Sequence, residues 1–151
     1  MSLISEADQE KLRAAFSEMT SPVRLMFFTQ TLGCETCLEA RQILDELPPL
    51  SDKISIEEVN LILEGDKAKQ YGIDRAPAIA LVGEDRREGV PGQISDSRIR
   101  FLGTPAGYEF ISLSQAVLLV GGRPAGITDE NRKRLAAVNT PLTMQVFTTP
   151  T

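Results

Sequence analysis

The sequence contains no histidine among its 151 residues. Histidine is the general base of Ser-His-Asp and Cys-His catalytic machinery, so its absence excludes both kinds of hydrolytic site. Two cysteines without histidine also provide too few ligands for a structural zinc site, unless carboxylates or a second chain complete it. Neither G-x-x-x-x-G-K-[ST] nor G-x-G-x-x-G after a strand is present, which excludes the nucleotide sites that those motifs form.

Long hydrophobic runs and basic clusters are missing as well. No apolar stretch is long enough to span a bilayer, and the first 25 residues carry too many charges for a signal peptide. The net charge of −5, without a basic stripe, gives no electrostatic footprint for nucleic acid. We therefore expect a cytoplasmic globular protein that binds neither membrane nor nucleic acid, with one core and room for a fragment of a second unit.

The two cysteines, Cys34 and Cys37, form a C-x-x-C motif where a predicted strand meets a predicted helix. Residues 25–29 form a short apolar run that suits a buried strand. The helix that follows must stop at Leu47, because two prolines come next. This pattern predicts Cys34 in the first helical turn and Cys37 one turn further in. Four positions share helical spacing and predict one buried stripe: Cys37, Ala40, Leu44 and Leu47.

That placement favours redox chemistry. Unpaired amides and the positive dipole end at a helix N-terminus stabilise a thiolate, so Cys34 is the candidate exposed and ionisable sulfur. Cys37, facing inward, can close a small disulfide ring with it. Two alternatives remain open from the residues alone: a pair of buried structural thiols, or an iron–sulfur or zinc site shared between two chains.

The other elements follow from hydrophobic spacing and from turn residues. Ser5 is the expected N-cap of a first helix that ends at Ser21-Pro22. We expect strands at residues 53–60, 78–82 and 98–102, the last of them at a sheet edge, and a polar helix at 64–71 closed by Gly72. Residues 83–97 are interpreted as a long exposed hairpin connection. A last helix carries one apolar side and stops at Gly121-Gly122: Phe110, Leu113, Val117 and Val120.

A proline, Pro77, stands at the mouth of the strand at residues 78–82. A proline in the first position of a strand costs no ladder hydrogen bond. From the residues alone a trans Ala76–Pro77 bond is favoured, because about 5–6% of X–Pro bonds in folded proteins are cis.

The last 25 residues repeat the beginning of the chain. Ile127-Thr128 matches Ile4-Ser5 at an offset of 123, and Val146-Phe147-Thr148 matches Phe27-Phe28-Thr29 at an offset of 119. A repeat of this kind indicates a duplicated domain. We therefore expect one domain at residues 1–122, and at 123–151 a linker, a helix and the first strand of a truncated second unit.

The pattern as a whole resembles the thioredoxin/glutaredoxin superfamily. Three stretches, at residues 4–8, 73–78 and 101–110, are similar to the N-terminal unit of glutaredoxin-like protein disulfide oxidoreductases, which contain two thioredoxin folds in tandem. The resemblance implies an α/β thioredoxin fold, with a central mixed four-stranded sheet flanked by helices and an extra N-terminal helix. On this basis residues 123–151 begin a second thioredoxin-like unit.

The resemblance also implies the roles of single residues. Cys34 is the nucleophile and Cys37 the resolving thiol of a protein disulfide oxidoreductase, and no cofactor is required. Pro77 is a cis proline beside the sulfurs, which replaces the trans preference, and the backbone of Ala76 pairs with an incoming peptide. The implied partners are protein dithiols and disulfides, an upstream thiol or flavoenzyme reductant, and the second unit of the same chain.

Two residues between the cysteines, Glu35 and Thr36, are expected to tune the reduction potential of the Cys34/Cys37 pair. The carboxylate of Glu35 opposes a neighbouring thiolate and raises the pKa of Cys34, which favours a reducing couple. Two positions depart from thioredoxins proper: Phe28 stands where those proteins keep a buried acid, and Gly33 replaces an aromatic residue. The alternative function is a redox-inactive or weakly active binding module that supports catalysis by a second C-x-x-C unit.

Overall fold

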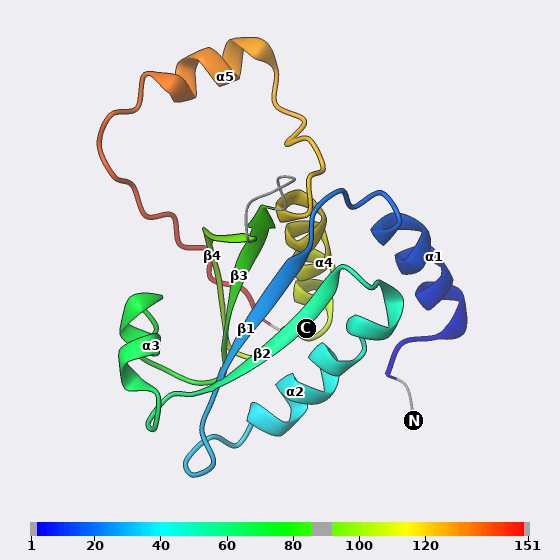
Figure 1. Cartoon of the computed structure of the whole chain (residues 1–151), viewed down its shortest axis with the longest axis vertical. Coiled ribbons are helices and arrows are strands. Elements are labelled where there is room, and N and C mark those ends of the chain that lie inside the picture. The colour runs from blue at the N-terminus through cyan, green and yellow to red at the C-terminus, as the bar shows by residue number, and fades with distance from the viewer. Residues whose placement is uncertain (1–2, 86–91, 150–151) are drawn as a thin grey trace.

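The computed structural model describes residues 3–85 and 92–149 and contains one four-stranded sheet with the order β2-β1-β3-β4 (Figure 1). Strand β1 runs parallel to β2 and antiparallel to β3, and β3 is antiparallel to β4. The predicted mixed thioredoxin-type sheet is therefore confirmed. The strands are β1 (Val23–Thr29), β2 (Ile54–Asn60), β3 (Ala78–Asp85) and β4 (Gln93–Leu102).

Helices flank this sheet, and the expected N-terminal helix precedes it (Figure 1). The Ser5 hydroxyl caps that helix by accepting a hydrogen bond from the Asp8 N–H at 3.2 Å, as its position predicted. Gly72, with φ of 67°, follows α3 in the left-handed conformation predicted for it. The helices are α1 (Glu6–Phe16), α2 (Cys37–Asp45), α3 (Gly65–Gln70), α4 (Tyr108–Val120) and α5 (Asp129–Ala136), with a short 3₁₀ helix η1 (Pro48–Leu50) after α2.

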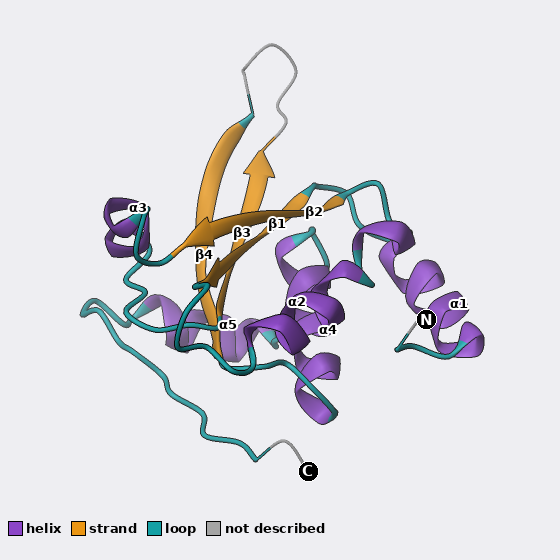
Figure 2. Ribbon diagram, turned by 90° about the horizontal axis from the view of Figure 1, so that it is seen from below, coloured by secondary structure: helices purple, strands orange, loops and turns teal. Residues whose placement is uncertain are grey.

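Strand β1 is buried on both faces, because it lies between two neighbours and helices cover both sides. Leu25 and Phe27 pack into a cluster with α1, α2 and α4, whereas Met26 and Phe28 pack into a second cluster with α3 (Figure 2). The four residues of the predicted stripe, Cys37, Ala40, Leu44 and Leu47, are all buried, although α2 ends at Asp45 and Leu47 follows it. This packing fixes the start of α2 against the end of β1.

The first helix is shorter than predicted. It ends at Phe16, not at Ser21-Pro22, because the N–H of Ser17 still bonds to Arg13 while that of Met19 turns back to Phe16. Met19 is nevertheless buried, so its side chain belongs to the core although it lies in the turn after the helix.

The predicted connection at residues 83–97 is wrong in extent. Strand β3 continues to Asp85 and β4 already begins at Gln93, and residues 86–91 lie outside the described residues. Residues 93–96 are all exposed, so no burial pattern in the sequence marks them as a strand. The predicted position of β4 at a sheet edge is confirmed.

The segment after α4 partly follows the predicted repeat. The Thr128 hydroxyl caps α5 by accepting from the Asn131 N–H, as Ser5 does for α1. Residues 139–149 form neither helix nor strand, and the whole described segment from 124 onward is exposed (Figure 1). Its assignment as the start of a second unit therefore stays a prediction. Within the described part of the chain, no helix combines the length and the apolar character needed to cross a membrane.

Charged residues on the α3 face of the sheet form an ion-pair cluster. Glu57 accepts hydrogen bonds from Lys67 and, at 3.0 Å, from Arg24, which also pairs with Glu84. Lys67, then Arg24, hold the pKa of the Glu57 carboxyl below its ordinary value of 4.5. This stabilisation is present above that ordinary value and is lost as the pH falls through the lower pKa of the folded state.

We expect Glu57→Gln to lower the free energy of unfolding by about 0.5–1 kcal/mol at pH 7, because all partners are roughly one-third exposed. Urea denaturation at pH 7 and at pH 3.5 measures the difference between wild type and variant, which should shrink at the lower pH. An equal difference at both values would show that the Glu57 charge contributes nothing.

Candidate redox site

Four chain segments meet at one edge of the sheet. The strand register places Thr29 beside Asn60, and Phe28, Ala78 and Leu102 across neighbouring strands. Four segments therefore lie at the same edge of the sheet: those that follow β1, β2 and β4, and the one that precedes β3. Two backbone bonds join them in pairs: Leu61 N–H to the Thr29 carbonyl at 2.8 Å, and Gly103 N–H to the Pro77 carbonyl at 2.9 Å.

The two cysteines lie at this edge, in the segment after β1, and are joined in a disulfide with a Cα–Cα distance of 5.5 Å. Cys37 is 6% exposed, whereas Cys34 is half-buried. The more exposed cysteine is thus the one that the sequence predicted.

The helix start differs from the prediction. Helix α2 begins at Cys37, so Cys34 lies in the turn before the helix and not in its first turn. Gly33 adopts a left-handed φ of 75°, and Thr36, the N-cap, has ψ of 0°, so helical geometry does not extend back to Cys34. The disulfide nevertheless bonds the Cys34 sulfur to the first residue of α2. That sulfur therefore still lies at the helix N-terminus, where backbone N–H groups have no intrahelical partner.

Thr36 contributes to the site through its backbone. Its carbonyl accepts hydrogen bonds from the Ala40 N–H at 3.0 Å and from the Thr104 hydroxyl at 3.4 Å, while its side chain makes no capping bond. Thr104 thus links the segment after β4 to the turn that carries the disulfide. Sequence reasoning missed Thr104, although its place directly after β4 puts it at the same edge.

The Ala76–Pro77 bond is cis, as the resemblance implied, and the trans preference drawn from residue statistics is wrong. Pro77 is buried and Ala76 is half-buried, directly before β3. The Pro77 carbonyl is held by Gly103, so the proline is fixed against the segment after β4. Packing of Pro77 beside the sulfurs, and backbone pairing of Ala76 with a peptide, stay predictions.

Acidic groups at this edge differ in burial. Glu35 is exposed. Phe28, which the resemblance places where thioredoxins proper keep a buried acid, is fully buried, and its ring centroid lies 5.9 Å from that of Tyr71. Glu109, in the first turn of α4, is half-buried, and desolvation raises the pKa of its carboxyl. Within residues 3–85 and 92–149, no three Cys, Asp or Glu side chains are grouped as metal ligands would be.

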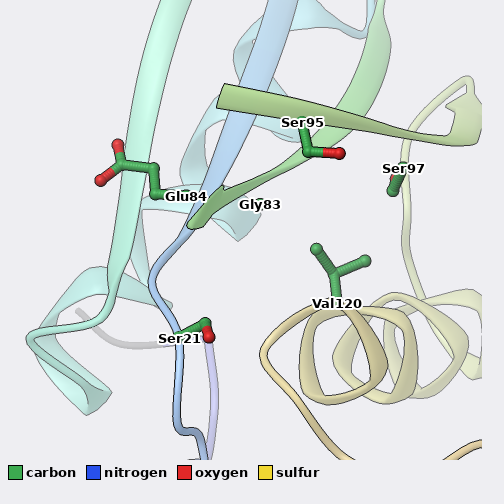
Figure 3. Close-up of a pocket in the computed structure, with 6 residues that line it drawn as sticks. All are labelled: Ser21, Gly83, Glu84, Ser95, Ser97 and Val120. Carbon is green, nitrogen blue, oxygen red and sulfur yellow. The ribbon is translucent and has the colours of Figure 1, made fainter. Parts of the chain in front are cut away.

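Two surface cavities lie away from the disulfide. One, of about 240 Å³, lies at the opposite end of the sheet, where Gly83 pairs with Val23 (Figure 3). Its lining is mostly small and polar, and the Ser97 hydroxyl already donates to the Leu81 carbonyl. The other, of about 260 Å³, lies between the N-terminal segment, α2 and the turn before α4. Neither of these two cavities is lined by a cysteine.

Comparison with known proteins identifies the family. A probable thioredoxin of Methanothermobacter marburgensis is 35% identical over 72 residues, which cover 84% of that protein and 47% of this chain. The chain belongs to the thioredoxin family. No family model matches it.

Larger relatives share more of this thioredoxin-family chain. The F component of alkyl hydroperoxide reductase from Xanthomonas campestris pv. phaseoli is 34% identical over 116 residues, which are 76% of this chain and 18% of the relative. The chain thus spans less than one fifth of that protein.

Solved structures give the same fold. The N-terminal domain of the same reductase component from Enterococcus faecalis superposes with a TM-score of 0.76 at 28% identity, covering 90% of this chain and 61% of that one. A protein disulfide oxidoreductase from Aeropyrum pernix has a TM-score of 0.71 at 22% identity, covering 88% of this chain and 54% of that one, and supports the fold alone.

Proposed function

We propose that this chain is a thiol–disulfide oxidoreductase that exchanges disulfides with protein substrates through Cys34 and Cys37. One observation carries the proposal: a disulfide at the start of α2, with one cysteine half-buried at the sheet edge and the other buried. A buried structural pair would not need one sulfur near the surface. The relative named thioredoxin supports the same chemistry.

The reaction is exchange through a mixed disulfide. In the reduced protein, the Cys34 thiolate attacks one sulfur of a substrate disulfide, and the other substrate sulfur leaves as a thiolate. Cys37, deprotonated, then attacks the Cys34 sulfur and releases the second substrate thiolate. The substrate gains two electrons and the Cys34–Cys37 pair loses them, so a thiol or flavoenzyme reductant must restore the dithiol.

The neighbouring residues receive matching roles. Ala76 offers backbone groups to an incoming peptide, and Pro77 fixes that backbone beside the sulfurs. Glu35 opposes the Cys34 thiolate by its charge, and Thr36 orients the turn through its carbonyl. Because a less stabilised thiolate favours the disulfide form, we assign a reducing couple.

The setting of the unit is part of the proposal. We place it in the cytoplasm, where paired thiols are kept reduced and serve redox chemistry more often than scaffolding. The partners are protein dithiols and disulfides and a second thioredoxin-like unit, of which residues 123–151 are the beginning. The thioredoxin-like parts of the larger relatives support this arrangement.

The test is reduction of insulin by the chain in the presence of dithiothreitol, with titration of the cysteine pair in thiol–disulfide buffers. We expect catalysed insulin reduction and a reversible two-electron titration. The variant with both cysteines changed to serine is the control and should lack both. A normal titration without insulin reduction would instead support the binding-module alternative.

The same titration tests Glu35. Removing its charge in Glu35→Gln should stabilise the Cys34 thiolate and make the reduction potential less negative. An unchanged or more negative potential would show that this exposed carboxylate does not act on the couple.

A further inference from the structure

Several large apolar side chains are exposed on the edge that carries the disulfide. Large apolar side chains stand in the segments after β1 and β2, at the end of β4, and in the first turns of α2 and α4. Their exposed fractions lie between 52% and 84%, so no other described element covers them. They are Leu32, Leu38, Ile62, Leu63, Leu102 and Tyr108.

The net charge on this edge is negative. The four segments and the first helical turns next to them hold six carboxylates and two cations, Arg75 and Lys67. Both cations are neutralised: Arg75 Nε lies 2.8 Å from an Asp74 oxygen, and Lys67 pairs with Glu57. The carboxylates are Glu35, Glu39, Glu64, Asp66, Asp74 and Glu109.

Helix capping explains only part of this charge. Glu39, Asp66 and Glu109 lie in first helical turns, where the helix dipole favours acids. Glu35 and Asp74 lie in turns outside any helix, and both are exposed. Asp74 is neutralised by Arg75, so Glu35, directly after Cys34, is the one of these two whose charge neither capping nor that ion pair accounts for.

We propose that this edge selects disulfides flanked by lysine or arginine and by an apolar side chain. The inference rests on the proposed function, because it names the substrate class of the same sulfurs. Basic flanks would meet the exposed carboxylates of Glu35 and Glu39, which lie close to the cysteines in the sequence, and an apolar flank would cover the exposed leucines. Disulfides flanked by carboxylates meet like charge and are disfavoured. Attraction of this kind acts on the association rate and is screened by salt.

Three synthetic peptides test the inference. Each has one intramolecular disulfide and one leucine, and they differ only in flanking pairs of lysine, glutamine or glutamate. We expect the reduced chain to react about tenfold faster with the lysine peptide than with the glutamate peptide at low ionic strength. In 0.5 M NaCl the ratio should approach one. A ratio near one at low salt would overturn the inference.

A charge-reversal variant assigns the effect to this edge. Glu39→Lys/Asp66→Lys should abolish or invert the lysine-to-glutamate ratio, since both side chains are exposed and lie in first helical turns next to this edge. Glu10→Lys/Glu130→Lys makes the same change in net charge on α1 and α5 and should leave the ratio unchanged. If both variants lower the ratio equally, net charge alone causes the preference and the inference fails. Failure of every variant to reduce the glutamine peptide would instead count against the proposed function.

Discussion

The Cys37→Ser variant is expected to accumulate a covalent mixed disulfide with its substrate. Cys34 keeps its position at the N-terminus of α2 and its access to solvent, so it still attacks. Without the second sulfur nothing releases the substrate. Non-reducing electrophoresis with a disulfide substrate should show a stable adduct that dithiothreitol removes.

The Cys34→Ser variant is the matched comparison. Its remaining thiol, Cys37, is buried, as are Ala40 and Leu44 of the same helix, so it should trap little substrate and react slowly with iodoacetamide. Faster alkylation of Cys37, or a stable adduct in Cys34→Ser, would reverse the assigned roles.

The Phe27→Ala variant is expected to lose about 3–5 kcal/mol of unfolding free energy. Phe27 is 1% exposed and packs in the cluster that joins β1 to α1, α2 and α4, so its removal leaves a cavity that rigid neighbours cannot fill. Urea denaturation followed by circular dichroism measures the loss.

Two further variants calibrate that result. Phe27→Leu keeps most of the volume and should cost about 1 kcal/mol. Leu63→Ala removes an apolar side chain that is 84% exposed, and should change stability by at most about 0.5 kcal/mol. A cost for Phe27→Ala no larger than that for Leu63→Ala would contradict the described core.

The sequence predicts the elements that burial patterns mark. Leu44 and Ala40 identify the inner face of α2. Strand β1 shows no alternation of apolar and polar residues because both of its faces are buried, and its continuous apolar run identifies it instead. The first half of β4 is invisible, since residues 93–96 are exposed on both faces and carry no periodic signal. Hydrophobic periodicity reports burial, and a strand beyond the core has none.

The site is predictable in its residues but not in its local geometry. The C-x-x-C spacing identifies Cys34 and Cys37, yet the helix starts at the second cysteine because backbone angles at Gly33 and Thr36 decide it. The cis bond before Pro77 came from family resemblance, because residue statistics favour the opposite isomer. Thr104 needed the strand register, which places segments far apart in sequence side by side.

The junction between α1 and β1 constrains how the protein folds during synthesis. The N–H groups of Thr20 and Ser21 both bond to the carbonyl of Gly121, at the end of α4. The chain before β1 is therefore held by residues that are translated about 100 positions later, which takes roughly 5–20 s on a ribosome. Until then the face of β1 that carries Leu25 and Phe27 lacks the part of its cover that α4 supplies.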